Sequence, residues 1–417
     1  MSQWLPPRAS RRNFTVMGLD VSFFSLALSF ASVYGVLPLF VQHLSTSNLA
    51  IGAIPAVRST LYLPPIFVAG LTERLARKQP FVLGVTVFER LPYLALAIAT
   101  PLLATTRPTA LLWLFFAMIA VTTIAGGATM PAWIDLIARM MPDDWRGRFF
   151  GFSSALGGLL GIGGSASAAA LLSRYPWSTG IALCFACCFA FMIVSFVFLT
   201  LGREPVAETP VIKTSRPQTG AWRRLPALVR QDRNLRWYLV AIALITSASA
   251  AAPFYIVEAK HRLLLSDAAA SLYAVVLLAA STAGSILWGY VGDHFGHKRV
   301  VLGGALCAAF AAALALALRQ PIGFGVVFLL VGLSTSGFQL SSLTFIVDLA
   351  PIEQRPTYVG LAMFTQTPFA AVAPLLIAVV ADEGGYSAVF ALTAALALAA
   401  FLLVWFAVHD PRKRVIG

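Results

Sequence analysis

Charged residues are scarce in this chain of 417 residues, since Asp, Glu, Lys and Arg together make up only 11% of it. Soluble proteins carry roughly 25% of these residues. Apolar residues make up 59% of the chain, and its mean hydropathy is +0.82. The shortage of charge therefore excludes a water-soluble protein and indicates an integral membrane protein.

Acidic residues are scarcer than basic ones: 17 Asp and Glu stand against 30 Lys and Arg, which gives a net charge of +13. In a soluble protein such a charge would suggest a nucleic-acid partner. Here most basic residues lie between the apolar segments, where they reflect membrane topology. We therefore expect a lipid bilayer around the protein, with contact to acidic head groups, and no nucleic acid.

Metal-binding and catalytic patterns are also lacking. The four cysteines, which include a C-x-x-C-C run at 184 to 188, lie in apolar segments without His or Asp at ligand spacing. Cysteine in such a setting is usually a small buried apolar residue. The sequence has no P-loop, and its five histidines lie at segment ends or in loops. We expect no metal, no cofactor and no catalytic residue.

Long apolar segments are what the chain has in abundance. Each can form a helix of about 20 residues, which crosses the roughly 30 Å of hydrocarbon in a bilayer. None shows the alternation of a membrane β-strand. The predicted fold is all-α, with twelve transmembrane helices. They are expected at 14–42, 48–71, 80–103, 109–134, 149–172, 180–201, 236–258, 268–291, 300–318, 321–347, 358–381 and 387–408.

The first and fifth spans could be mistaken for other features. The first follows the basic stretch PPRASRRN (6–13), but its apolar run exceeds the roughly 7 to 15 residues of a signal peptide, so we expect a retained helix. The fifth contains GGLLGIGGSASAAA (157–170). Small residues inside a span predict close packing against a neighbouring helix rather than a nucleotide loop.

The basic residues gather in alternate connections between the spans. If the N-terminus is cytoplasmic, most of the 30 Lys and Arg residues lie on the cytoplasmic side, as such residues do in membrane proteins. An even number of spans returns the C-terminus to the same side. We expect a multi-pass protein of the cell membrane (inner or plasma membrane) with both termini in the cytoplasm.

A long polar stretch divides the spans into two sets of six. Residues 202–235 are rich in basic residues and proline, and AWRRLPALVRQDRNLRW (221–237) could form an amphipathic helix on the acidic inner leaflet. The expected organisation is an N-terminal six-helix bundle (1–201), a cytoplasmic linker (202–235) and a C-terminal six-helix bundle (236–417).

The two halves resemble each other in sequence. AGLTERLARK (69–78) follows the second span, and GYVGDHFGHK (289–298) follows the eighth. Asp135 at the end of the fourth span likewise matches Asp348 at the end of the tenth. Internal repeats of this kind are common in transporters.

Two six-helix halves of the same topology, joined by a basic loop, resemble the major facilitator superfamily. The most specific match is that family's loop signature, G-x-x-x-D-(R/K)-x-G-x-(R/K)-(R/K). The residues that fit it are Gly289, Asp293, Gly296, Lys298 and Arg299, with His294 in place of the usual base. The N-terminal copy is degenerate: Glu73 replaces the Asp, Ala replaces both glycines, and Arg74 remains.

The resemblance implies that this loop is a cytoplasmic gate. An Asp can interact with the positive N-terminus of a helix, and glycines allow a sharp turn and a close approach of helices. In the family the loop holds the two halves together in one state and releases them in the other. We expect the receptor at the start of the fifth or eleventh span, near Arg146 or Arg355. An ordinary positively charged loop is the alternative.

Ionisable residues inside the spans are few, and each costs about 2.5 to 3.5 kcal/mol at mid-membrane, so they need a reason. Asp20 begins a helical stripe that continues to Tyr34. Because the first helix of each half faces the central cavity in the resembled family, Asp20 is the best candidate for carrying a proton. A carboxylate near the interface, paired with a loop Arg, is the alternative.

Three further charges lie in the second and third spans. Arg58 and Glu89 should differ in depth by roughly 6 Å, which side chains can bridge. They form either a structural ion pair or a contact with substrate or proton. Arg90, next in sequence, lies about 100° round the helix, and we expect it to extend toward the cytoplasmic surface.

Polar and aromatic side chains in later spans could bind a polar, partly aromatic solute. The candidates are Trp133, Gln339 and Gln366. Hydrogen bonds between helices are the alternative role for them.

The pattern as a whole favours a monomeric secondary transporter that works by alternating access. Because no P-loop is present, we expect an ion gradient to drive it, most simply protons, with export of a small organic solute. The alternatives are an importer of a sugar or organic ion, a flippase for lipid-like substrates, a non-transporting membrane sensor and a membrane enzyme.

Overall fold

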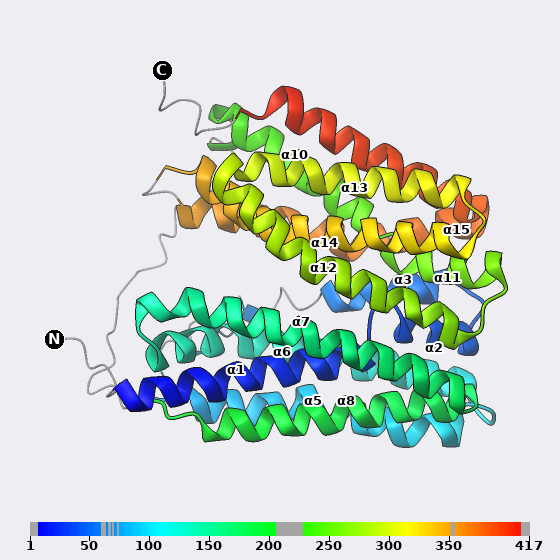
Figure 1. Cartoon of the computed structure of the whole chain (residues 1–417), viewed down its shortest axis with the longest axis horizontal. Helices are drawn as coiled ribbons and strands as arrows, with labels where there is room; N and C mark the ends of the chain where they lie inside the picture. The colour runs from blue at the N-terminus through cyan, green and yellow to red at the C-terminus, as the bar shows by residue number, and fades with distance from the viewer. Residues whose placement is uncertain are drawn as a thin grey trace. The chain divides into compact units, whose positions relative to one another are not determined.

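The computed structural model describes residues 7–59, 64–65, 68, 71–72, 75–205, 228–351 and 355–409. Their regular secondary structure is helical (Figure 1), which confirms the all-α prediction. The helices are α1 (Pro7–Phe30), α2 (Val36–Leu44), α3 (Asn48–Arg58), α5 (Gln79–Leu103), α6 (Pro108–Met140), α7 (Asp143–Arg174), α8 (Trp177–Leu201), α10 (Arg233–Ser249), α11 (Ala252–Leu263), α12 (Asp267–Phe295), α13 (His297–Ala317), α14 (Pro321–Leu349) and α15 (Arg355–Ala407).

Ten helical stretches of the described residues are long and apolar enough to cross a membrane. The spans expected at 358–381 and 387–408 both lie in α15, which consists of two helices that meet at a kink, where Gly385 has a non-helical conformation (φ 69°, ψ 177°). Of the span expected at 48–71, α3 covers the first part, and much of the rest lies outside the described residues. The chain is therefore a multi-pass helical membrane protein.

Prolines stand where several helices begin. Pro80, Pro108 and Pro321 occupy the first two positions of α5, α6 and α14. Proline suits these positions because its fixed φ matches a helix and its missing N–H has no partner in a first turn. The starts predicted for these three spans agree with the observed helices to within a residue.

Two expected spans are interrupted. The span predicted at 14–42 divides into α1 and α2, because the Ser32 hydroxyl accepts the N–H of Tyr34 (3.2 Å) and the Ser32 carbonyl accepts that of Leu37 (3.0 Å). Such local hydrogen bonds compete with the helical ladder. The span predicted at 236–258 divides into α10 and α11, just before Pro253, which cannot donate a backbone hydrogen bond. One continuous helix was wrong for 14–42, whereas Arg233–Leu263 still forms one apolar stretch long enough to cross a membrane, with a short turn at Ala250 and Ala251.

The chain forms two compact units. The first comprises Met1–Thr46, Val57–Lys213 and Ser266–Val275. The second comprises Ser47–Ala56, Thr214–Leu265 and Val276–Gly417. The domain boundaries expected at residues 201 and 236 stay a prediction.

Close helix contacts organise the first unit. Helix α1 packs against α7 and α8, and α5 packs against α6 and α8 (Figure 1). A Cβ added at Gly164 of α7 would lie 2.1 Å from the Ser29 Oγ, and one at Gly157 would lie 2.9 Å from the Ser25 Oγ. Larger side chains here would force α7 away from α1. The close-packing face predicted in the fifth span is thus confirmed.

In the second unit, α13 packs against α14 and α15, and α10 packs against α15. The hydroxyl of Tyr238, on α10, donates to the main-chain carbonyls of Ser341 and Ser342 (3.3 and 3.2 Å). The indole N–H of Trp288, on α12, donates to the carbonyl of Leu333 on α14 (2.8 Å). Tyr238, inside the apolar core, and the partly buried Trp288 thus both find partners for their polar atoms.

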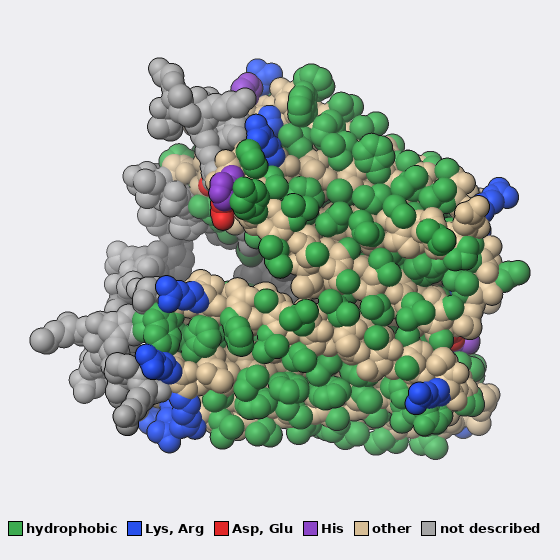
Figure 2. All heavy atoms as spheres, in the orientation of Figure 1, with side chains coloured by type: hydrophobic (Ala, Val, Ile, Leu, Met, Phe, Trp, Pro, Cys, Tyr) green, Lys and Arg blue, Asp and Glu red, His purple; other side chains and the backbone are tan. Residues whose placement is uncertain are grey.

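Large hydrophobic side chains are exposed along the helix flanks. Trp113, Ile286 and Phe406 are each more than 70% exposed. Figure 2 shows hydrophobic side chains covering the sides of the helices, whereas the visible Lys and Arg side chains lie near helix ends. This distribution suits a surface that faces lipid in the middle and water at the ends.

Candidate functional site

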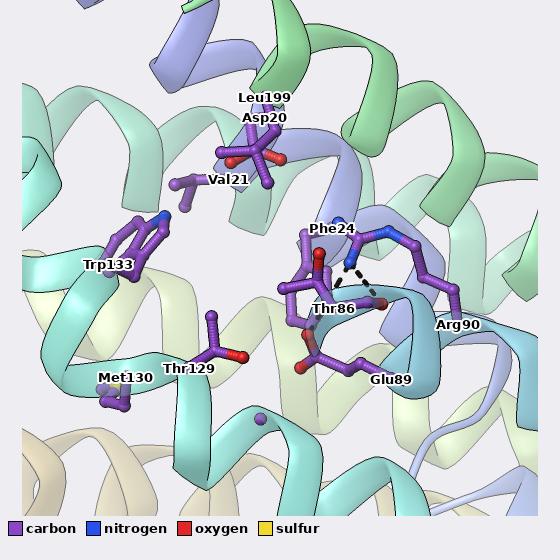
Figure 3. Close-up of a pocket in the computed structure, with 11 residues that line it drawn as sticks. Asp20, Val21, Phe24, Thr86, Glu89, Arg90, Thr129, Met130, Trp133 and Leu199 are labelled. Carbon is purple, nitrogen blue, oxygen red and sulfur yellow. Dashed lines mark hydrogen bonds and ion pairs between the residues drawn. The ribbon is translucent and has the colours of Figure 1, made fainter. Parts of the chain in front are cut away.

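A cavity of about 180 Å³ lies within the first unit. Four helices, α1, α5, α6 and α8, contribute its walls (Figure 3). It contains three of the four intramembrane charges identified in the sequence. The lining residues are Asp20, Val21, Phe24, Thr86, Glu89, Arg90, Gly126, Thr129, Met130, Trp133 and Leu199.

Asp20 is held by groups from other helices. Its side chain is buried, with 5% of the residue exposed, and its Oδ1 accepts a hydrogen bond from the Ser195 Oγ of α8 (2.6 Å). The indole of Trp133, on α6, lies near the same carboxylate. The expected alternative, a loop arginine, is not the partner seen here. Asp20 instead links α1 to α8 inside the membrane span.

The guanidinium of Arg90 forms hydrogen bonds with other groups of the protein. Its Nε donates to the carbonyl of Met192 (3.0 Å), its Nη1 to the carbonyl of Thr86 (2.9 Å), and its Nη2 to the Ser195 Oγ (3.4 Å). The guanidinium also lies over the ring of Phe196, 5.2 Å from its centroid. Arg90 is 3% exposed. The expectation that it extends to the surface was therefore wrong, because α8 offers enough acceptors to bury it.

Glu89 pairs with Arg90 rather than with Arg58. The Oε2 of Glu89 lies 3.8 Å from the Nη1 of Arg90, beyond hydrogen-bonding distance, and its side chain is 15% exposed. Figure 3 shows the carboxylate on the cavity side of α5. The expected Arg58–Glu89 ion pair was therefore wrong, and Glu89 pairs instead with Arg90, its neighbour in sequence.

Arg58 lies behind the cavity wall. It ends α3, is partly buried, and is close to the fully buried Tyr93. It is near enough to Glu89 for an electrostatic interaction, although it does not line the cavity. Its predicted depth placed it near Glu89, as observed. Its close neighbour on α5 is Tyr93.

The remaining cavity walls are mainly apolar and aromatic. Phe24 comes from α1, Met130 and Trp133 from α6, and Leu199 from α8. Thr129 turns its hydroxyl to the carbonyl of Ala125 one turn earlier (2.8 Å), so that its hydrogen is used inside α6. Trp133 is thus a cavity residue, as its candidate role requires.

Three other candidates lie elsewhere. Tyr34 falls in the break between α1 and α2, so the helical stripe predicted from Asp20 to Tyr34 is not continuous. Gln339 is exposed on α14, and Gln366 is half-buried on α15, both in the second unit. None of the three lines the cavity of the first unit.

The loop signature has the turn that its glycines suggest. Gly296 has φ 90° and ψ 146° and caps α13, a conformation that L side chains rarely adopt. A Cβ at Gly289, in contrast, would meet no atom within 4 Å. The close helix approach expected there is absent, and it occurs instead at Gly292, where a Cβ would lie 3.0 Å from the His297 ring.

The charged members of the signature lie around this turn. Asp293 is exposed in the last turn of α12. Lys298 Nζ donates to the carbonyl of Trp405 (3.2 Å), and the guanidinium of Arg299 lies 5.2 Å from the ring centroid of Phe295. Arg146 donates to the carbonyl of Ala138. The side chains of Glu73, Arg74 and Arg355 lie outside the described residues.

A hydrogen bond beside the signature was missed in the sequence. His297 Nδ1 lies 2.8 Å from Asp348 Oδ2 and joins the start of α13 to the end of α14. The match between Asp135 and Asp348 in the repeat was the available signal, since Asp135 also makes ion pairs, with Arg139 (2.9 Å) and Lys78 (3.5 Å).

Glu204, just after α8, was also missed. Its carboxylate accepts the backbone N–H groups of Lys78 and Gln79 at the start of α5 (2.9 Å each), and it lies 3.5 Å from Arg139. Its side chain is 2% exposed. A carboxylate at a helix N-terminus satisfies donors that the helix cannot. Its position in the polar stretch 202–235 concealed this role.

Comparison with known proteins identifies the family. The sequence matches the Major Facilitator Superfamily over residues 19–261 and 238–416, which together span most of the chain. The chain therefore belongs to this superfamily and is a secondary transporter, not an enzyme. The family predicted from the loop signature and the repeated halves is confirmed.

Solved structures share the fold over nearly the full chain. A mutant of the nucleoside transporter NupG matches with a TM-score of 0.71 at 13% identity, covering 95% of this chain and 98% of that one. The D-xylose-proton symporter matches with a TM-score of 0.70 at 15% identity, covering 97% and 99%. A bacterial homologue of the human lysosomal transporter Spinster matches with a TM-score of 0.69 at 13% identity, covering 98% and 97%. Among curated protein sequences, none matches this chain.

Proposed function

We propose that this chain couples proton movement to the export of a small organic solute, with Asp20 as the group that carries the proton. The observation that carries the proposal is a buried carboxylate on the wall of an intramembrane cavity, bonded to Ser195 and paired with no loop cation of the described residues. An ionisable side chain in such a place is costly, and in transporters it marks a proton or substrate pathway.

The contacts of Asp20 suggest how its protonation would affect the neighbouring helices. Ionised Asp20 accepts the hydrogen of Ser195, and Arg90 reaches the same hydroxyl from the other side. Protonation of Asp20 removes its charge and adds a hydrogen that the carboxyl can donate, so the hydrogen bond from Ser195 becomes weaker. When Asp20 is neutral, Glu89 is the ionised carboxylate of the cavity that remains beside Arg90. One proton thus alters contacts among α1, α5 and α8.

The loop after α12 is proposed as the cytoplasmic gate. Asp293 is exposed at the end of α12, and Gly296 makes the turn that leads into α13. A carboxylate at this place is available to a helix N-terminus in one transport state and to water in the other. Lys298 and Arg299 add positive charge, which favours the cytoplasmic side. The proposed setting is a monomer in the cell membrane with both termini in the cytoplasm.

The test uses the full chain in proteoliposomes with a trapped pH-sensitive dye. A panel of nucleosides, pentoses, dipeptides and aromatic amines is added, and proton movement caused by each solute is recorded. We expect at least one solute to move protons through the wild type. Asp20→Asn should reduce this movement at least tenfold while solute exchange continues, because Asn cannot titrate but can still accept the Ser195 hydrogen.

The matched control is Ser195→Ala, which removes the hydrogen bond to Asp20 but keeps its carboxylate. This variant should retain part of the coupling, because the titrating carboxylate remains while its contact with α8 is lost. Undiminished coupling in Asp20→Asn would remove Asp20 from the mechanism, and proton movement by no solute of the panel through the wild type would contradict proton coupling.

A further inference from the structure

The cavity of the first unit offers an anion little to bind. Among the described residues that line it, Arg90 is the only cation, and the donors of this guanidinium face Met192, Thr86 and Ser195. The ring of Phe196 covers one face of the group. An anionic solute would have to displace these contacts, which are made in a buried setting where lost hydrogen bonds are costly.

Glu89 has the opposite character. Its nearest charged partner is Arg90, at 3.8 Å, and among the described residues no hydrogen bond to its carboxylate is formed. Asp20, in contrast, already accepts a hydrogen bond from Ser195 and has the Trp133 indole nearby. Glu89 therefore keeps acceptor capacity on the cavity side, where Figure 3 shows its carboxylate.

The balance of charge at the cavity wall favours a cation. Among the described lining residues, two carboxylates, Asp20 and Glu89, face one guanidinium, Arg90, so this part of the wall has an excess of one negative charge when it is ionised. Arg58 acts on Glu89 from behind the wall and does not reach the cavity. In a medium of low dielectric this excess attracts a monovalent cation and repels an anion.

The other walls suit the body of such a cation. Phe24 and Trp133 offer aromatic rings, whose faces attract cations, and Met130 adapts its shape to an irregular partner. A volume of about 180 Å³ is below the roughly 300 Å³ at which pockets for drug-sized ligands begin. The cavity therefore suits a compact body, such as one aromatic ring with a small ammonium group.

We infer that Glu89 binds the positive group of a small monovalent organic cation, whose apolar body lies against Phe24, Met130 and Trp133. The inference rests on the proposed transport function and assigns its substrate class. A proton on Asp20 adds positive charge to the same cavity and so opposes the cation. Proton and substrate would then exclude each other, which is the requirement for exchange in opposite directions.

The experiment measures equilibrium binding to the purified full chain in detergent by titration calorimetry. The probes share one ring and differ in charge: phenyltrimethylammonium, the neutral N,N-dimethylbenzamide, and benzoate. We expect the cation to bind at least tenfold more tightly than either other probe. Glu89→Gln should remove this preference, whereas Glu89→Asp should retain part of it.

Glu383→Gln is the matched control, because Glu383 is an exposed acid outside the cavity. It should leave the preference for the cation intact. If Glu89→Gln does not fold, the ranking of the three probes on the wild type decides alone. Tightest binding of benzoate, equal binding of all three probes, or no binding of the cation to folded wild type would overturn the inference.

Binding at equilibrium needs no proton gradient, so this result is separate from the coupling test. Cation binding through Glu89 without proton movement would overturn the coupling proposal and leave this inference standing. Proton movement caused only by neutral or anionic solutes would overturn this inference and leave the coupling proposal standing.

Discussion

Two carboxylates of the same cavity differ in what surrounds them. Asp20 is bonded to Ser195, whereas Glu89 has only a distant ion pair with Arg90. The sequence marks both as costly charges inside spans, and it led directly to Asp20, Glu89 and Trp133. It could not identify Ser195, which is 175 residues from Asp20, because a serine in an apolar span is unremarkable.

The correction for Arg90 has a similar origin. Depth along the helix predicted that Glu89 would reach Arg58, but depth does not report which backbone carbonyls a neighbouring helix presents. Helix α8 presents the carbonyl of Met192, 102 residues away in sequence, and buries Arg90 beside Glu89. The sequence thus predicts which charged residues lie inside the membrane, whereas the partners of these residues depend on how the helices pack.

Glycine at position 296 is a residue whose role can be tested by stability alone. Its φ of 90° is unfavourable for an L side chain, so Gly296→Ala should lower the free energy of unfolding by about 1 to 2 kcal/mol. Gly289→Ala is the matched variant in the same signature. Gly289 lies within the helix α12, and an added Cβ there would meet no atom within 4 Å. This variant should be neutral or stabilise the protein by up to about 1 kcal/mol.

Thermal or denaturant unfolding of both glycine variants in detergent measures the difference. Equal stability of Gly296→Ala and Gly289→Ala would contradict the turn described for this loop.

At the scale of helices, starts are more predictable than interruptions. Proline at positions 80, 108 and 321 marks three starts directly. The break at 31–35 depends on hydrogen bonds of Ser32, and serine elsewhere in the same helix does not interrupt it: Ser22 bonds back to Gly18 within α1 (2.7 Å). The residue type alone therefore does not distinguish the two outcomes.

Helix α5 begins at a carboxylate supplied by another part of the chain. Glu204 accepts two backbone N–H groups there and lies beside Arg139. Glu204→Gln keeps an acceptor but removes the charge, so we expect a loss of about 1 to 3 kcal/mol in the free energy of unfolding. Hydrogen exchange should rise in the first turn of α5.

Glu383→Gln, at an exposed position, is the control and should change neither quantity. A Glu204→Gln protein as stable as the wild type, with unchanged exchange at residues 79 to 82, would show that Glu204 is not needed at this helix start.

At the scale of the whole chain, composition and repetition carry most of the prediction. The low charge, the long apolar segments and the repeated loop signature led to a helical membrane protein of the major facilitator superfamily, and the sequence match confirms the family. Substrate and direction do not follow from these features, because solved structures of this fold include a nucleoside transporter and a D-xylose-proton symporter.

The most direct test of the account is transport of phenyltrimethylammonium into proteoliposomes under an imposed pH gradient. This cation cannot lose a proton, so it is not trapped passively. A lumen about one pH unit more acidic than the medium stores about 1.4 kcal/mol per proton, enough for roughly tenfold accumulation in one-for-one exchange. We predict accumulation that approaches this value in an acidic lumen, none in an alkaline lumen, and none with Asp20→Asn. Accumulation driven by an acidic medium, or accumulation independent of the gradient, would contradict proton-coupled export.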